Sequence, residues 1–323
     1  MRAAVHTRYG PPDVVRIEEV KEPVPRGNEV LVRIHATTVN RTDCGFRAAR
    51  PFITRFFTGL RKPRVTIMGT EFAGVVEAVG AGVTAFKIGE RVFGYSEGRF
   101  GCHAELLSVP VNGSIASIPA NLTFVEVAPS TEGAHYALAF IRKAKIQHGQ
   151  AVLVNGATGA IGSAAVQIIK GLGAQVTAVC DTAHLELVRG LGADRVIDYT
   201  MEDFTKDNQQ YDVVLDAVGK STFGRCRRLL KRGGSYLSSD LGPLCQNPVL
   251  ALVTPLLPGK TVRFPTPRDS QAIVRHLKEL IESGIFRPVI DRRYQFDQIV
   301  EAYRYVETGQ KIGNVVIEVE PPR

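Results

Sequence analysis

The stretch LVNGATGAIG (153–162) decides the fold of the middle of this chain. Three glycines, Gly156, Gly159 and Gly162, recur at every third residue where an apolar run ends. The run AVLVN is typical of a buried strand, and AIGSAAVQIIKGLG spaces its apolar residues like one face of a helix. Such a turn is a plain connection, a device for packing the helix, or a cradle for a phosphate.

A second strand, QVTAVC (175–180), follows the helix, and this context favours the phosphate cradle. Strand, glycine turn, helix and strand form the setting of the dinucleotide-binding fingerprint, although Ala157 replaces its first glycine. Gly159 would let the backbone approach a pyrophosphate, and Gly162 would let the helix pack closely on the strand. The helix N-terminus presents unpaired N–H groups to the phosphates. The predicted nucleotide contacts here are Gly156, Ala157, Thr158, Gly159, Ala160, Ile161 and Gly162.

The chain shows two different patterns of predicted secondary structure. Residues 1–122 are short strands interrupted by Gly and Pro, such as EVLVRIHATTV (29–39), which suggests a mostly antiparallel β unit. Beyond 123, strands alternate with helices, which predicts a parallel sheet covered on both faces. After about 268 a helix (272–284) precedes a closing strand (313–320). The fold class is therefore α/β with an added β unit.

Composition narrows the class of protein. The 323 residues are 44% hydrophobic and 22% charged, and no apolar run is long enough to span a membrane. The net charge is +8, but Lys and Arg are spread along the chain, which favours a solvated basic surface over a nucleic-acid site. Five cysteines without a CxxC pair indicate reduced thiols. We therefore expect a cytoplasmic protein with no nucleic-acid partner and no membrane partner.

The residues after the second and third strands bear on the choice of nucleotide. Asp181 ends the second strand, where a carboxylate binds a ribose 2′-hydroxyl and disfavours a 2′-phosphate. Alternatively, Asp181 is the N-cap of the next helix. His184 and Tyr199 are placed to contact a 2′-phosphate, with an exposed helix position as the alternative for His184.

Several longer stretches together carry a family resemblance. They are GTEFAGVVEAVGAGVTAFKIGERVFG (69–94), VNGATGAIGSAAVQIIKGLGAQV (154–176), LGADRVIDY (191–199), YDVVLDAVG (211–219) and IGNVVI (312–317). The chain resembles the medium-chain dehydrogenase/reductase superfamily, in particular its zinc-free, zeta-crystallin-like quinone oxidoreductase branch. The resemblance implies a discontinuous GroES-like β-barrel domain (1–122 and 267–323) and a Rossmann domain (123–266). It also implies a homodimer, or sometimes a tetramer, as the usual assembly.

This chain differs from the zinc enzymes of the superfamily at the positions of their zinc ligands. Those enzymes have a Cys in a C-G-x-D stretch and a His in G-H-E, where this chain has NRTD (40–43) and GTE (69–71). Asn40 and Thr70 are poor replacements for zinc ligands, and the four-Cys structural loop is absent. His103 is interpreted as a packed residue. We expect no zinc.

The resemblance also assigns further site residues. Asn40, Asp43 and Tyr136 are catalytic candidates, with a structural cap or ion pair as the alternative for Asp43 and simple packing for Tyr136. Val218 and Gly219 would approach the nicotinamide ribose. Lys311 and Asn314 would meet the cofactor, with solvated surface as the alternative for Lys311.

The implied function is an NAD(P)H-dependent, zinc-independent reductase of quinones or α,β-unsaturated carbonyl compounds. NADP is favoured because most of the branch uses it, and Asp181 keeps NAD open. The alternatives are an alcohol or aldehyde dehydrogenase of the same superfamily and a non-catalytic nucleotide- or RNA-binding protein.

Overall fold

The computed structural model describes residues 1–96, 98–267 and 270–319. The chain forms two compact units: Met1–Glu132 with Asp269–Glu282 and Pro288–Arg323, and Gly133–Arg268 with Ser283–Arg287. Segment 123–132, which the predicted domain limits place in the Rossmann domain, packs in the first unit through Phe124, Val127 and Ala128. The domain limits themselves stay a prediction.

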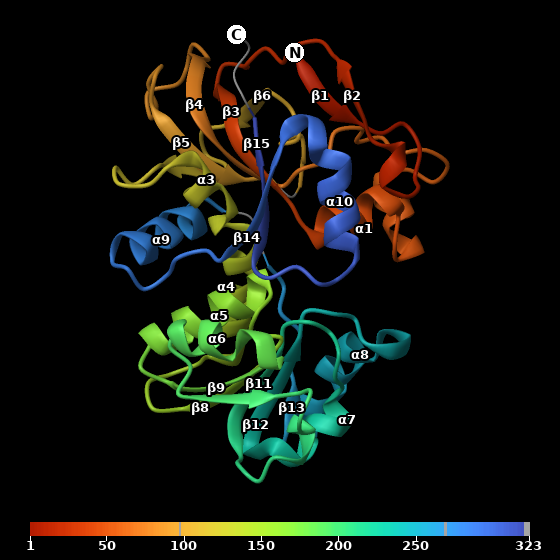
Figure 1. The fold of residues 1–323 in the computed structure, drawn as a ribbon, viewed down its shortest axis with the longest axis vertical. Coiled ribbons are helices and arrows are strands. Elements are labelled where there is room, and N and C mark those ends of the chain that lie inside the picture. Colours follow the sequence, from red (N-terminus) through yellow and green to blue (C-terminus); the bar gives the residue numbers. More distant parts are fainter. Residues whose placement is uncertain (97, 268–269, 320–323) are drawn as a thin grey trace. The chain divides into compact units, whose positions relative to one another are not determined.

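The first unit is built on antiparallel strands, as expected. Its strands are β1 (Arg2–Val5), β2 (Arg16–Glu19), β3 (Glu29–Val39), β4 (Glu71–Val79), β5 (Arg91–Tyr95), β6 (Leu106–Pro110), β7 (Ile115–Ser117), β14 (Ile290–Gln295) and β15 (Asn314–Glu318). Seven of them form a sheet of order β14-β15-β3-β4-β5-β7 with β6 also on β3, and only β14–β15 is a parallel pair within it. The long strand β3 therefore pairs with β15, so the two ends of the chain share one core (Figure 1).

Five α-helices accompany these strands within the described part of the first unit. They are α1 (Arg41–Ala48), α2 (Arg55–Thr58), α3 (Phe124–Val127), α9 (Gln271–Glu282) and α10 (Ile299–Glu307). A capping box between Asn40 and Asp43 starts α1 directly after β3. Helix α9 buries Ile273, Val274 and Leu277 on one face, as its helical spacing predicts.

The second unit is a parallel sheet with helices on both faces, which confirms the predicted class (Figure 1). Its strands are β8 (Ala151–Asn155), β9 (Gln175–Cys180), β10 (Arg195–Asp198), β11 (Tyr211–Asp216), β12 (Leu230–Ser238) and β13 (Thr261–Val262). Its helices are α4 (Glu132–Ala144, whose first residue belongs to the first unit), α5 (Ala160–Gly171), α6 (Leu185–Gly190), α7 (Phe223–Cys226) and α8 (Gln246–Val253). The order β10-β9-β8-β11-β12-β13 reverses between β8 and β11, and ligands bind beyond the strand ends at such a switch point.

Two glycines in the opening stretch allow the tight turn from β8 into α5. Gly156 has φ +80°, a left-handed conformation, and a Cβ there would lie 2.7 Å from Val218 Cβ. A Cβ on Gly162 would lie 2.0 Å from the Gly156 carbonyl oxygen. Gly162 is therefore the packing device among the three alternatives for this turn.

We predict that Gly162→Ala lowers the free energy of unfolding by about 3 kcal/mol, because backbone must move to admit the methyl group. Urea denaturation measures the change. Gly190→Ala is the matched control, since a Cβ there meets nothing within 4 Å, and it should leave stability within about 1 kcal/mol. Equal effects of the two substitutions would contradict the packing role.

Candidate functional site

The glycine turn leaves the N-terminus of α5 open. Gly159 is the N-cap and no side chain caps this helix. A Cβ on Gly159 would meet nothing closer than the Gly156 carbonyl oxygen at 3.7 Å, and its φ of −72° suits any residue. Neither the backbone nor the packing of the chain therefore requires glycine here. The N–H groups of the first turn remain available for an anion.

The turn after β11 meets the glycine turn at the switch point. Gly219 has φ +68°, and a Cβ there would lie 2.7 Å from Asp240 Cβ. Asp216, at the end of β11, is fully buried and shapes this turn: its carboxylate accepts from the backbone N–H groups of Gly219 at 3.0 Å and Ser221 at 2.8 Å. Sequence reasoning missed Asp216, although its place at the carboxyl end of a parallel strand is a readable signal. It positions Val218 and Gly219.

Asp181 and His184 form a pair beyond the ends of β9 and β10. Asp181 occupies the N-cap position of a 3₁₀ turn (Thr182–His184), but its side chain makes no capping bond. Its Oδ1 instead lies 2.5 Å from His184 Nδ1, and both side chains are about 30% exposed. Tyr199 lies beside them, because its N–H donates to the Cys180 carbonyl oxygen at 3.0 Å. Burial and the Asp181 carboxylate raise the pKa of Tyr199.

In the first unit, Asn40 and Asp43 lie together. Asn40 Oδ1 accepts from the Asp43 N–H, and Asp43 accepts from the N–H groups of Asn40 and Gly69. Burial raises the pKa of the Asp43 carboxyl well above its ordinary value. These contacts show a structural role for Asp43, which holds the loop that presents Asn40, and its catalytic role stays a prediction.

Asn40 also contacts Thr70, which occupies the second position at which the zinc enzymes have a ligand. Its Nδ2 donates to Thr70 Oγ1 at 2.7 Å, and both side chains are buried. An amide and a hydroxyl bonded to each other do not match the deprotonated, tetrahedral ligand set that zinc requires. Among the residues that the structure describes, no group of three or more His, Cys, Asp or Glu could hold a metal ion.

Glu71 follows Thr70 and was not among the predicted site residues. Its buried carboxylate accepts from Thr38 Oγ1 at 2.6 Å, the Thr131 N–H at 2.9 Å and the Glu132 N–H at 2.6 Å. Burial raises its pKa, and these donors oppose the rise. Glu71 ties β4 to the start of α4.

Lys311 and Asn314 take different places at the start of β15. The Lys311 ammonium is partly buried and donates to the Gly313 carbonyl oxygen, so it is not the solvated side chain of the alternative interpretation. Burial lowers its pKa, and the carboxylates of Glu132 and Glu71 oppose this. Asn314 Nδ2 donates to the Val289 carbonyl oxygen at 3.0 Å, a bond that fixes a loop.

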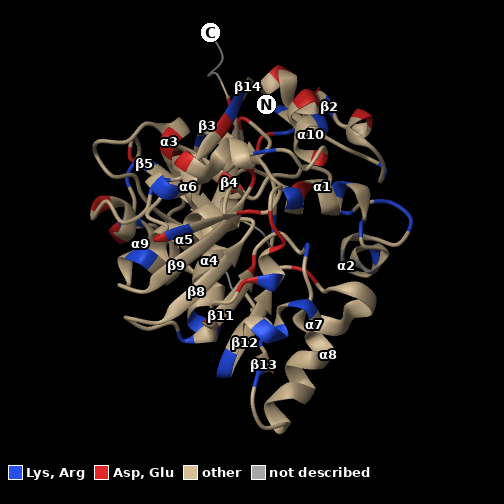
Figure 2. Cartoon of the chain, turned by 60° about the horizontal axis from the view of Figure 1, so that its bottom comes forward, with Lys and Arg blue, Asp and Glu red and all other residues tan. Residues whose placement is uncertain are grey.

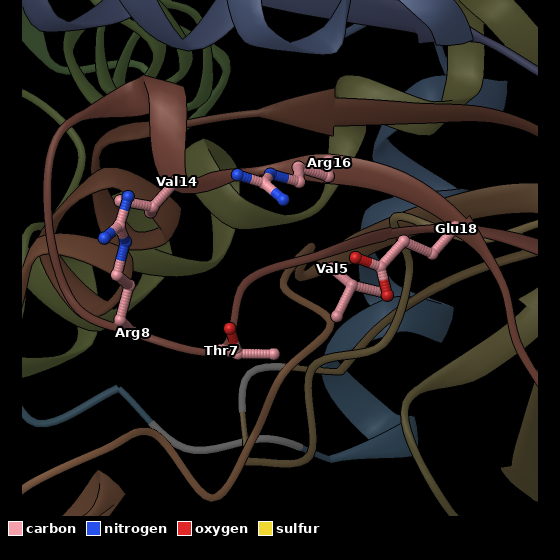
Figure 3. Close-up of a pocket in the computed structure, with 6 residues that line it drawn as sticks. All are labelled: Val5, Thr7, Arg8, Val14, Arg16 and Glu18. Carbon is pink, nitrogen blue, oxygen red and sulfur yellow. The ribbon is translucent and has the colours of Figure 1, made fainter.

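Tyr136 lies on α4 and is partly exposed, with its ring edge-on to His135 at 5.6 Å. The structure thus brings together Asn40 with Asp43, the glycine turn with Val218, and Asp181 with His184 and Tyr199. A hollow elsewhere, lined by Val5, Thr7, Arg8, Val14, Arg16 and Glu18, contains none of the predicted site residues (Figure 3).

His103 is a packed residue, as the sequence indicated. It is fully buried, its Nε2 donates to the Thr38 carbonyl oxygen at 2.8 Å, and its Nδ1 accepts from the Tyr303 hydroxyl at 3.1 Å. Burial lowers its pKa to about 4. The imidazole is therefore neutral at physiological pH.

Comparisons with known proteins agree with this architecture. Residues 26–120 match the alcohol dehydrogenase GroES-like domain, and residues 191–317 match the zinc-binding dehydrogenase family. The 2-methylene-furan-3-one reductase of Solanum lycopersicum is 33% identical over 99% of this chain and 80% of its own length. The NADPH-dependent alkenal/one oxidoreductase of Arabidopsis thaliana is 30% identical over 98% of this chain and 79% of its own length. The quinone oxidoreductase structure from Coxiella burnetii shares the fold, with a TM-score of 0.87, 24% identity and 99% of both chains covered.

A GroES-like unit joined to a nucleotide-binding parallel sheet defines a dehydrogenase/reductase of the medium-chain type. The chain belongs to this superfamily and to its quinone oxidoreductase branch.

We predict that the His103 imidazole titrates near pH 4 in NMR spectra. Its pKa of about 4 lies below the ordinary 6.5, so the unfolded chain binds the proton first as the pH falls. His103 thus stabilises the fold above pH 6.5, and up to about 3 kcal/mol is lost as the pH falls to 4. His103→Asn should flatten the pH dependence of the unfolding free energy in this range. An imidazole signal that titrates near 6.5 would contradict the burial argument.

Proposed function

We propose that this protein is an NAD(P)H-dependent reductase that passes hydride to a quinone or an α,β-unsaturated carbonyl compound, without catalytic zinc. The observation that carries the proposal is a glycine at position 159 that neither backbone conformation nor packing requires, since a Cβ there would meet only the Gly156 carbonyl oxygen at 3.7 Å. A phosphate seated on the turn accounts for it, because a side chain there would occupy the phosphate's place. The choice of substrates is supported by relatives named 2-methylene-furan-3-one reductase, NADPH-dependent alkenal/one oxidoreductase and quinone oxidoreductase.

The residues of the second unit suit a nicotinamide nucleotide. Its pyrophosphate would rest on the N-terminus of α5, and its ribose hydroxyls or 2′-phosphate would meet Asp181, His184 and Tyr199. Asp216 holds the turn that presents Val218 and Gly219 to the nicotinamide ribose. When bound, the nucleotide supplies the hydride.

NADP is proposed over NAD because of the charged side chains that would surround the adenosine ribose. Asp181 alone would repel a 2′-phosphate, but it is already paired with His184. The His184 side chain and the Tyr199 hydroxyl are the proposed partners of the phosphate oxygens.

The substrate must be activated by hydrogen bonds in place of a metal. Negative charge that develops on the acceptor oxygen is stabilised by fixed donors in a site sheltered from water. The second amide hydrogen of Asn40 and the Tyr136 hydroxyl are the proposed donors, with Asp43 and Thr70 holding the Asn40 side chain. Conjugated acceptors need less stabilisation, because delocalisation spreads the charge. Tyr136 or water returns the proton.

The proposal is tested by titrating the purified protein with NADPH and NADH, followed by nucleotide fluorescence, and then adding a 1,4-quinone. We expect quinone-dependent oxidation of the nucleotide and no stoichiometric zinc.

The Gly159→Asp variant should bind the nucleotide at least a hundredfold more weakly because of charge repulsion, while its urea denaturation should be unchanged. Unchanged turnover in this variant would contradict the proposed phosphate site at the glycine turn. Tightly held zinc, or oxidation of simple alcohols in place of quinone reduction, would favour the alcohol dehydrogenase alternative. Nucleotide or RNA binding without turnover would favour the non-catalytic alternative.

We predict that His184→Ala weakens NADPH binding about tenfold and NADH binding less, because a charge-assisted bond is lost and the Asp181 charge is exposed. His276→Ala, an exposed histidine paired with Glu279 in the other unit, is the control and should change neither affinity. Tighter NADH than NADPH binding in the unaltered protein would instead make Asp181 the ribose ligand. Assembly as a homodimer and a cytoplasmic location stay predictions.

A further inference from the structure

A basic aromatic segment, residues 50–64 (RPFITRFFTGLRKPR), has no role in the proposed chemistry. It contains five Lys or Arg residues and no Asp or Glu, so it carries +5 of the net charge of +8. It spans the 3₁₀ turn Phe52–Thr54 and helix α2. Figure 2 shows blue segments on the chain around α2.

Large apolar side chains of this segment face solvent. Phe52 is 62% exposed, Phe56 is 64% exposed and Leu60 is 58% exposed. The rings of Phe52 and Phe56 pack edge-on at 6.3 Å. Clustered exposed apolar side chains mark interaction sites on soluble proteins.

The cations around this apolar cluster are available to a partner. Arg50, Arg61, Lys62 and Arg64 are exposed, and the described residues provide no acidic partner for any of them. Arg55 lies over the rings of Tyr9 and Phe52 at 4.9 and 5.2 Å. The Tyr9 hydroxyl bonds Thr58 Oγ1 at 2.7 Å and the Gly59 carbonyl oxygen at 2.8 Å, which anchors α2 to the first unit.

We propose that the basic aromatic segment docks on the surface of a membrane that contains anionic lipids. Its cations would meet the phosphate and carboxylate groups of the lipids, and Phe52, Phe56 and Leu60 would enter the interface. An aliphatic Leu60 and a mutually packed ring pair suit acyl chains better than nucleic-acid bases, which need free ring faces. A second copy of this chain would bring like charges together. An anionic lipid surface therefore fits the segment best.

This proposal revises the expectation that the protein has no membrane partner. That expectation rested on the lack of a long apolar run, and no helix among the described residues could cross a membrane. Docking at the interface needs only a short apolar cluster with flanking cations. The proposal is independent of the proposed reaction.

The test is co-sedimentation of the whole protein with vesicles of phosphatidylcholine, with and without phosphatidylserine. We expect binding only to the anionic vesicles, and weaker binding as salt rises. The variant with Arg61→Gln, Lys62→Gln and Arg64→Gln should bind about a hundredfold more weakly. The double variant Phe56→Ser, Leu60→Ser should also bind the vesicles more weakly. The salt dependence of its remaining vesicle binding should be unchanged.

A matched control removes the same charge elsewhere. Arg142→Gln, Lys143→Gln and Lys145→Gln alter three exposed cations at the end of α4, and this variant should bind vesicles like the unaltered protein. Circular dichroism and urea denaturation establish that each variant is folded. Equal loss in both charge variants would show a general charge effect and overturn the proposal. So would no vesicle binding at all, equal binding to single-stranded RNA through the same residues, or a dimer that Phe56→Ser with Leu60→Ser dissociates.

Discussion

The close approach of α5 to β8 is the constraint on which the nucleotide half of this protein depends. The Gly162 backbone passes so near the Gly156 carbonyl that a single methyl group would not fit. This contact directs the helix N-terminus to the carboxyl ends of β8 and β11, where the sheet order reverses. With Gly159 adding no side chain, the first helical turn is left open. One packing contact thereby supports the proposed phosphate site.

Buried carboxylates shape the loops on which the other site residues lie. Asp216 accepts backbone N–H groups after β11, Asp43 accepts them at the start of α1, and Glu71 accepts them at the start of α4. Each carboxylate replaces water with several fixed donors, which offset part of the cost of its burial. Such loops hold their shape without a ligand. Such preorganisation suits the proposed hydride transfer without a metal.

Two positions that hold zinc ligands in the zinc enzymes of the superfamily bear on the proposed chemistry. Asn40 and Thr70 bond each other where relatives with zinc have Cys and His. Under the proposed function, this exchange would remove a strong electrophile and leave weaker hydrogen-bond donors. Acceptors that delocalise their own charge are then the natural substrates, which links two substitutions to the proposed substrate class.

The sequence by itself determined the alternation of strands and helices, the glycine turn and the replacement of the zinc ligands. These features are local: strands 29–39 and 175–180 were predicted with the bounds that the structure has, because periodicity lies within one segment. The capping box of Asn40 and Asp43 is local too, but its spacing resembles a substrate motif equally well. Only the tertiary structure decided the role of Asp216, the pairing of Asp181 with His184 in place of a helix cap, and the bond from Tyr303 to His103 across 200 residues. The Asp216 and His184 contacts span only three to five residues, but they depend on how each turn closes after its strand. The bond from Tyr303 to His103 joins two distant segments, and no pattern within one segment carries that information.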